Sequence, residues 1–120
     1  MKPTDKARNI YGKRTITLAN TKAQVGPGWS GLIEKIWVKL PKSTLIEQVK
    51  EKYGTLRFYV SYVDEATQDF IDEVEHESGT ICEQCGEPGK VRSDMSWIQT
   101  LCDTHYHETY EYKNRKDGTK

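Results

Sequence analysis

The sequence lacks the features that mark membrane and secreted proteins. No apolar run in its 120 residues approaches the roughly 20 residues that a membrane helix needs. The first residues contain no apolar segment of the kind found in a secretory signal. The chain has three cysteines, whereas a disulfide scaffold normally uses an even number. We therefore expect a cytoplasmic protein in a reducing compartment, with no membrane partner.

Familiar catalytic motifs are also missing. The sequence contains no glycine-rich phosphate loop, no G-x-S-x-G and no H-E-x-x-H. Hydrophobic residues make up only 35% of the chain, yet three Trp, seven Tyr and two Phe argue against a fully disordered chain. The length fits one domain, or one domain with a small appendage, and excludes a large multidomain enzyme.

The formal net charge is zero, but the charge is unevenly distributed. Residues 1–27 carry a net charge of +5 and residues 113–120 carry +3, so residues 28–112 carry −8. Basic ends suit an acidic partner such as nucleic acid, although solvated, frayed ends are the more common explanation of such segments. These boundaries divide the chain into a basic, partly flexible N-terminal segment, a central body and a basic tail.

Apolar spacing predicts a helix after a chain break at residues 26–28. The apolar residues within 29–40 fall at the spacing of one helix face. Ser30 is the expected N-cap, and Pro41 is expected to end the helix. Before the break, the alternation in residues 14–18 is compatible with a short strand.

A hairpin and a second helix are expected next. Residues 44–63 alternate in hydrophobicity around a turn at Gly54, which predicts a β-hairpin. Residues 64–78 have helical spacing, with Asp64 as the expected N-cap. We expect an α+β core over residues 28–79, a small sheet or hairpin packed with two helices. The side chains expected to be buried are Leu56, Phe58, Val60 and Tyr62 on the hairpin, and Ala66, Phe70, Ile71 and Val74 on the helix.

All three cysteines belong to one pattern with a histidine, C-x2-C-x16-C-x2-H. Its members are Cys82, Cys85, Cys102 and His105. Zn²⁺ prefers four such ligands in a tetrahedron, and Gly86 allows the backbone to turn back after the first pair. A closed set of three thiolates and one imidazole leaves no position for a catalytic water, so we expect a structural zinc ion. His107 is an alternative fourth ligand, although the spacing from Cys102 favours His105.

The predicted zinc module covers residues 80–112. Residues 90–92 and 97–101 are expected to form two short strands, and Cys102 and His105 lie where a helix is expected to begin. The turn at residues 82–86, here called the knuckle, is followed by a hairpin and by a ligand pair at the start of a helix. This order resembles the treble-clef class of zinc fingers. That class is shared by nucleases, ribosomal proteins, RNA-binding modules and protein-interaction domains, so it does not specify a function.

One family of enzymes within the treble-clef class resembles a short part of this sequence. The segment 101–107 resembles the end of an HNH nuclease. Such an enzyme needs a general-base histidine on the hairpin, but residues 86–101 contain no histidine. We therefore expect no enzymatic activity.

A longer resemblance covers about residues 28–107. Gly28-Trp29 precedes the first helix, and residues 50–59 match K-x-K-[YF]-G-x-L-R-F-Y. Residues 82–86 match C-x-x-C-G, and residues 97–105 match W-x-x-T-L-C-x-x-H. Together these motifs resemble a set of small uncharacterised proteins of bacteriophages and bacteria. The resemblance implies a bacterial cytoplasm, that of the host for a phage-encoded protein, and it carries over no active site.

We expect a non-enzymatic, zinc-stabilised binding protein, a phage or bacterial factor that engages a host protein, for example in host takeover or anti-defence. A nucleic-acid-binding module is the first alternative, in which the basic ends, Lys90 and Arg92 meet phosphates.

A binder of a small anionic ligand, such as a nucleotide, is the second alternative. Its contacts would be Arg57 and Tyr59 on the open face of the sheet. Cross-strand pairing with Glu47 or Glu51 is the ordinary structural explanation of these two residues. Four further aromatic residues either contact a partner or pack on the zinc module: Trp97, Tyr106, Tyr110 and Tyr112. Packing on the module is favoured for Trp97.

Overall fold

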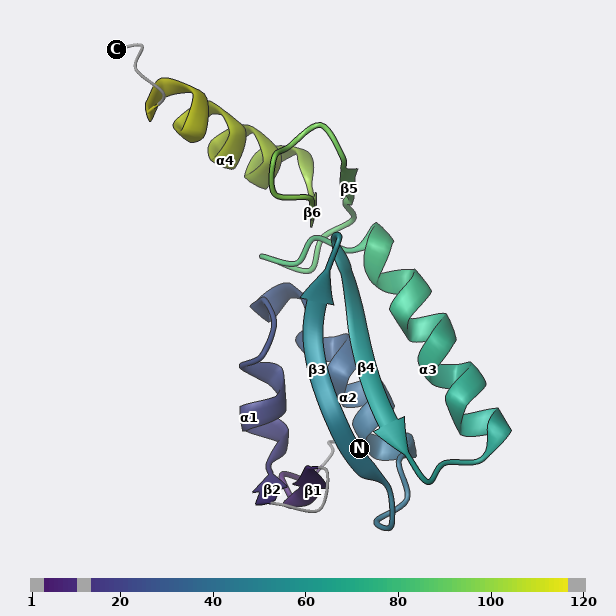
Figure 1. Cartoon of the computed structure of the whole chain (residues 1–120). Helices are drawn as coiled ribbons and strands as arrows, with labels where there is room; N and C mark the ends of the chain where they lie inside the picture. The colour runs from purple at the N-terminus through teal and green to yellow at the C-terminus, as the bar shows by residue number, and fades with distance from the viewer. Residues whose placement is uncertain (1–3, 11–13, 117–120) are drawn as a thin grey trace.

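A computed structural model describes residues 4–10 and 14–116 of the chain. Within this part the protein is α+β, with a four-stranded sheet, a two-stranded sheet and four α-helices (Figure 1). The predicted α+β class is therefore confirmed. None of the helices in these residues is long and apolar enough to cross a membrane.

The larger sheet is built around the predicted hairpin. Its strands lie in the order β2 (Arg14–Ile16), β1 (Arg8–Ile10), β3 (Leu45–Lys52) and β4 (Thr55–Ser61). β3 and β4 are antiparallel and joined by Tyr53 and Gly54, whose φ angles of 54° and 84° suit a two-residue hairpin turn. β1 pairs in parallel with β3, a long-range contact that local alternation does not predict.

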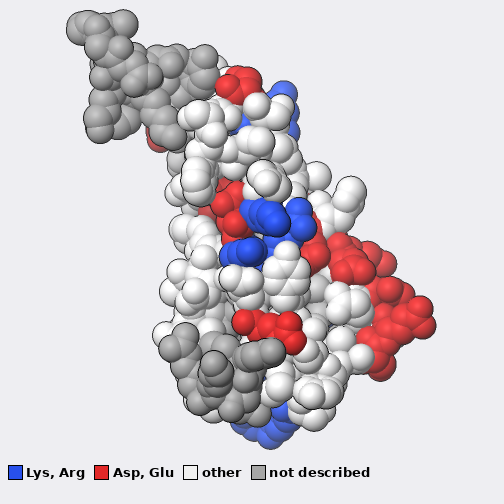
Figure 2. All heavy atoms as spheres, in the orientation of Figure 1, with Lys and Arg blue, Asp and Glu red and all other residues white. Residues whose placement is uncertain are grey.

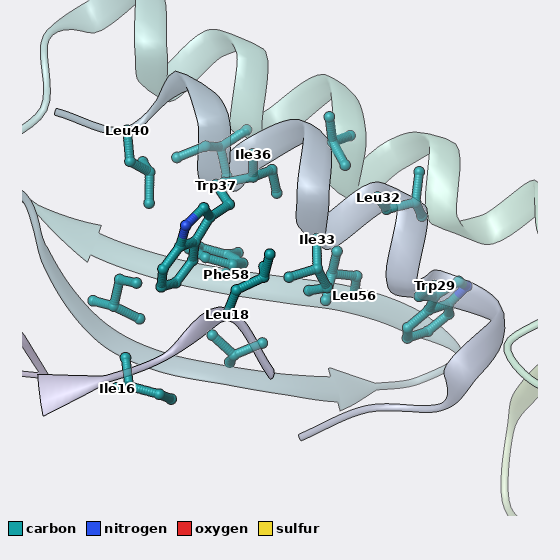
Figure 3. Close-up of a cluster of buried hydrophobic side chains, with 14 residues drawn as sticks. Ile16, Leu18, Trp29, Leu32, Ile33, Ile36, Trp37, Leu40, Leu56 and Phe58 are labelled. Carbon is teal, nitrogen blue, oxygen red and sulfur yellow. The ribbon is translucent and has the colours of Figure 1, made fainter. Parts of the chain in front are cut away.

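The main core lies between α2 (Ser30–Lys39) and this sheet. In Figure 3 the apolar side chains of α2 point toward Leu56 and Phe58 on β4, and Leu18 at the start of α1 (Leu18–Lys22) closes the same cluster. Ile33 in the middle of α2 is fully buried. The helix predicted from apolar spacing therefore buries the face that the spacing indicates.

The second predicted helix, α3 (Glu65–Glu77), lies beside β4. Its Glu75 Oε2 accepts a hydrogen bond from the backbone N–H of Phe58 at 2.7 Å, and Ser78 Oγ accepts one from Leu56 N–H at 2.8 Å. Side chains therefore satisfy N–H groups on the edge strand, which would otherwise be open to pairing with another chain. Burial is the main cause that raises the pKa of Glu75.

Helix boundaries follow the predictions at two of three positions. The Asp64 side chain caps α3, and α2 ends before Pro41. Ser30 was expected to cap α2, and this is wrong. It is the first helical residue, because the 3₁₀ turn η1 (Pro27–Trp29) leads directly into α2 and puts Trp29 at the cap position.

Two residues expected to be buried are exposed. Tyr62 follows the end of β4 with a φ of 68°, so its side chain leaves the sheet face and is 73% exposed. Ala66 lies in the first turns of α3 and is also exposed, because the buried part of this helix is centred on Ile71 and Val74. The other residues of the two predicted faces are buried or half-buried.

A C-terminal module lies at the end of the sheet where the β3–β4 turn is found (Figure 1). Its second strand is shorter than the predicted range 97–101, because it starts at Gln99. The described residues of the module bury only Cys82, Met95 and Leu101 as an apolar cluster. Its elements are η2 (Ser78–Thr80), β5 (Lys90–Arg92), β6 (Gln99–Leu101) and α4 (Asp103–Lys116).

Candidate metal centre

Three segments of the C-terminal module bring four potential metal ligands together. Cys82 and Cys85 lie in the turn that follows η2, Cys102 directly precedes α4, and His105 is in the first turn of that helix. One ligand atom from each residue lies within 4.8 Å of all the others. These four residues could hold a metal ion, as the spacing of the sequence predicts.

The separations of the ligand atoms define one compact donor set. Cys85 Sγ lies 3.8 Å from Cys102 Sγ, and His105 Nδ1 lies 3.3 Å from Cys102 Sγ and 3.6 Å from Cys82 Sγ. Among the residues that the structure describes, no other cysteine, histidine or carboxylate belongs to this cluster. The set is therefore one imidazole nitrogen and three sulfurs.

Of the two candidate histidines at the start of α4, only His105 lies at the cluster. His105 Nδ1 faces the sulfurs, whereas His107 is exposed and its ring makes an edge contact with Tyr106, with centroids 5.5 Å apart. The backbone N–H of His105 also points at Cys102 Sγ, at 3.5 Å. The sequence preference for His105 over His107 agrees with this placement.

The knuckle between the first two cysteines is held by backbone hydrogen bonds. The N–H of Cys82 donates to the carbonyl of Glu87 at 2.8 Å, and Gly86 N–H donates back to the Cys82 carbonyl at 2.9 Å. Gly86 has a φ of 84°, a conformation that favours glycine. The local sequence therefore forms the turn that brings both thiols to one point.

The site shifts the pKa values of its potential ligands in different directions. Burial tends to raise the pKa of Cys82, but backbone N–H groups, those of Cys102 and Cys85 foremost, outweigh burial and lower this pKa to about 7. The sulfur of Cys102 is the main cause that raises the pKa of His105. A metal ion binds the thiolate and the neutral imidazole, so the lowered pKa of Cys82 favours metal binding, whereas His105 must release its proton to bind.

Arg92 supports the candidate metal centre from inside the module. Its guanidinium donates two hydrogen bonds to the carbonyl of Leu101, at 3.1 and 2.9 Å, and one to Asp103 Oδ1 at 2.8 Å. It also lies 4.3 Å from the ring centre of Tyr106. Arg92 is 8% exposed. This burial argues against the phosphate contact expected of Arg92, whereas Lys90 on the same strand is exposed.

The knuckle docks on the N-terminal end of α2. Gly28 N–H donates to the carbonyl of Glu83 at 2.8 Å, and Trp29 Nε1 donates to the carbonyl of Ile81 at 2.9 Å. A Cβ atom on Gly28 would lie 2.0 Å from the Cys82 carbonyl oxygen, so only glycine allows this approach. Sequence reasoning treats residues 26–28 only as a chain break, because nothing local indicates a contact more than fifty residues away.

A second contact joins the module to the hairpin turn. Thr100 Oγ1 donates to the carbonyl of Gly54, and the backbone N–H of Thr100 donates to Glu83 Oε1 at 3.2 Å. Burial is the main cause that raises the pKa of Glu83. Sequence reasoning missed Glu83 and Thr100, which look like ordinary surface residues in the sequence.

The remaining candidate contact residues lie outside this site. Arg57 is half-buried and stands opposite Lys50, and Tyr59 stands opposite Gln48, so the expected pairing with Glu47 or Glu51 is wrong.

The aromatic candidates also differ from one another. Trp97 is 65% exposed, so the expectation that it packs on the module is wrong, whereas Tyr106 packs against the apolar cluster of the module. The side chains of Tyr110 and Tyr112 lie outside the described part of the structure.

Comparisons with known proteins add no relative. No protein-family model, no curated protein and no solved structure matches the chain. The resemblance to small phage and bacterial proteins therefore stays a prediction.

Proposed function

We propose that the chain is a non-enzymatic binding protein whose Cys3His cluster holds one structural zinc ion. The separation of the donor atoms carries this proposal. With zinc–sulfur bonds of about 2.3 Å and a zinc–nitrogen bond of about 2.0 Å, a tetrahedron has sulfur–sulfur edges of about 3.8 Å and sulfur–nitrogen edges of about 3.5 Å. The separations of 3.8, 3.6 and 3.3 Å match these edges closely.

The donor set supports a structural role for zinc over a catalytic one. Catalytic zinc sites usually have three protein ligands and leave the fourth position for water, whereas structural sites have four. A knuckle, the β5–β6 hairpin and a ligand pair at the start of α4 also support a treble-clef-like arrangement. In this proposal, zinc joins the knuckle to α4 and so fixes the module against the hairpin turn.

Exposed aromatic residues support a binding role. Tyr53 and Trp97 are 67% and 65% exposed and line a hollow of about 300 Å³ where the hairpin turn meets the module. Exposed aromatic side chains near a hollow are typical of recognition sites. The partner expected from the sequence is a host protein, and nucleic acid or a small anion are the alternatives.

Metal content measured on two histidine variants tests the zinc proposal. We expect native mass spectrometry of the full chain to find one zinc ion per chain, lost in His105→Ala and kept in His107→Ala. The two substitutions are chemically identical and two residues apart on α4, so each controls for the other. Equal zinc content in both variants, or no zinc in the unmodified chain, would contradict the proposal.

A further inference from the structure

The β3–β4 hairpin has one covered face and one open face. The covered face carries Leu56 and Phe58 and packs against α2, and Figure 1 shows no described helix in front of the other face. Alternation along the strands puts three cross-strand pairs on the open face. These pairs are Lys50 with Arg57, Lys52 with Thr55, and Gln48 with Tyr59.

Two cations stand directly opposite each other on this open face. Like charges in cross-strand positions repel and destabilise a sheet, and the pair here is Lys50 and Arg57. Among the described residues, no carboxylate forms an ion pair with either of them or with Lys52. Glu47 and Glu51 instead accept hydrogen bonds from a serine hydroxyl and from the backbone of the turn. The open face therefore keeps positive charge that an anionic ligand would stabilise.

Aromatic rings accompany these cations. Lys50 Nζ lies 5.9 Å from the ring centre of Tyr59, and Lys52 Nζ lies 5.7 Å from that of Tyr53. Tyr53 also lines the 300 Å³ hollow, together with Trp97, Lys52 and one carboxylate, that of Glu51. Alternating cations and exposed rings are the combination that binds single-stranded nucleic acid, because cations hold phosphates while bases stack on rings.

Acidic residues of the central body gather on α3, although Glu51 lines the hollow and Glu47 is exposed on β3. Asp69, Asp72 and Glu73 are exposed on α3, and Figure 2 shows a dense acidic area over this helix. In the same view a basic group lies over the end of the hairpin near its turn, with acidic atoms on either side of it. The charge of −8 in residues 28–112 is therefore an average over areas of opposite sign, and it does not exclude a polyanion from the hairpin.

We propose that the open face of the β3–β4 hairpin binds single-stranded nucleic acid. Lys50, Lys52 and Arg57 contact phosphates, Tyr59 stacks on a base, and Tyr53 and Trp97 receive a further base at the hollow. A duplex keeps its bases stacked and cannot use the rings in this way. This inference rests on the function proposed above in one respect only. Trp97 belongs to the module that zinc is proposed to hold in place.

Fluorescence anisotropy with the zinc-loaded full chain tests this inference. The probes are a labelled oligothymidine of about 20 nucleotides and a duplex of the same length, since single-strand sites on such surfaces cover about 4–16 nucleotides. Three phosphate contacts give a salt slope of about −2, so we expect affinity for the single strand to fall about 20-fold between about 50 and 200 mM salt. The duplex is expected to bind more weakly.

Charge variants separate binding from folding. Lys50→Gln and Arg57→Gln are each expected to weaken binding and to reduce the salt slope by about 0.7. The melting temperature of Lys50→Gln is expected to stay the same or rise, because this substitution removes a cross-strand repulsion. Arg57→Gln also loses the hydrogen bond that Arg57 Nε donates to Thr55 Oγ1 at 3.1 Å, so Lys50→Gln is the variant that separates binding from folding. Lys42→Gln is the matched control. Lys42 is exposed in the turn before β3, at the other end of the hairpin, and its loss is expected to leave affinity nearly unchanged.

Aromatic variants test the stacking. Tyr59→Leu and Trp97→Leu are each expected to weaken binding about 5- to 150-fold, as the loss of one stacked base does. Tyr62→Leu is the control, because Tyr62 is 73% exposed but follows the end of β4 away from the hollow.

Four outcomes would overturn the inference: no binding of the single strand, equal or tighter binding of the duplex, an equal loss in the two control variants, or full competition by polyglutamate. The last outcome would indicate an acidic protein partner. Zinc content is measured on the same samples. A zinc-loaded chain that fails to bind contradicts only this inference, whereas a chain without zinc contradicts the function proposed above.

Discussion

The α2–sheet core and the C-terminal module differ in what stabilises them. Fourteen hydrophobic residues form the buried cluster of the first, whereas three form that of the second among the described residues. Burial of one large apolar side chain contributes about 1.5–3 kcal/mol, so the module has little to offset the entropy of ordering its chain. We infer that apolar burial holds the first region, whereas the module depends on its polar contacts and, under the function proposed above, on a bound zinc ion.

The two regions are nevertheless joined by close backbone contacts. Gly28 lies against the carbonyl of Cys82, and Thr100 bonds to the carbonyl of Gly54. A change in one region is therefore expected to affect the other in proportion to how far it disturbs these contacts. The following changes separate the two regions or test their connection.

Loss of the proposed metal ion should have the largest effect, and it should unfold the module while the core stays folded, although the core loses its contacts with the module. Cys82→Ser is expected to unfold residues 80–112, because structural zinc contributes about 10–16 kcal/mol in isolated zinc fingers. The core is expected to remain folded. Two-dimensional NMR of the amides checks both statements, and zinc added back after chelation of the unmodified chain is the control. A module that keeps its dispersed signals in Cys82→Ser would contradict the comparison.

A cavity in the core should have the next largest effect. Phe58 is 1% exposed and lies at the centre of the cluster in Figure 3. Phe58→Ala is expected to lower the free energy of unfolding by about 3–5 kcal/mol, as measured by denaturant titration. The folded fraction should keep one zinc ion per chain. Loss of zinc from folded protein would show that the two regions are less separate than the packing indicates.

Adding a methyl group at Gly28, where the core and the module meet, should lower the stability by a smaller amount. In Gly28→Ala the new Cβ would meet the Cys82 carbonyl at 2.0 Å, so the knuckle or α2 must shift. The expected destabilisation is about 1–3 kcal/mol. Gly31→Ala is the matched control in the same segment, because nothing lies within 4 Å of its Cβ. A helical alanine there should stabilise the protein by about 0.5–1 kcal/mol. Thermal melting distinguishes the opposite signs, and equal effects would contradict the close contact.

The smallest effect is a change in pH dependence within the core region. The pKa of Glu75 is raised in the folded protein, mainly by burial. A carboxyl with a raised folded pKa stabilises the fold below its ordinary value of 4.5, and this contribution is lost as pH rises through the folded pKa. Glu75→Gln keeps an acceptor for Phe58 N–H but does not titrate. The difference in melting temperature between the two proteins should therefore shift in favour of the variant as pH rises through this window. A pH-independent difference would show that Glu75 has no raised pKa.

Predictions from the sequence succeeded where the signal is local and periodic. Apolar spacing identifies α2 and α3, and alternation around Gly54 identifies the hairpin. The ligand spacing likewise identifies the four members of the candidate metal centre, because two residues between ligands is a property of a single turn. The errors at Ser30 and Tyr62 occur at element ends, where one residue of turn geometry changes which way a side chain points.

By itself, the sequence determined the two helices, the hairpin and the Cys3His set, since each depends on residues that are near in the chain or on strict spacing. Only the tertiary structure decided that Gly28 contacts the knuckle, that Arg92 is buried, and that Lys50 and Arg57 stand opposite each other on an open face. These features depend on register and on how separate elements pack. Backbone approach and strand register are set by the summed contacts of many residues, which local propensity does not contain.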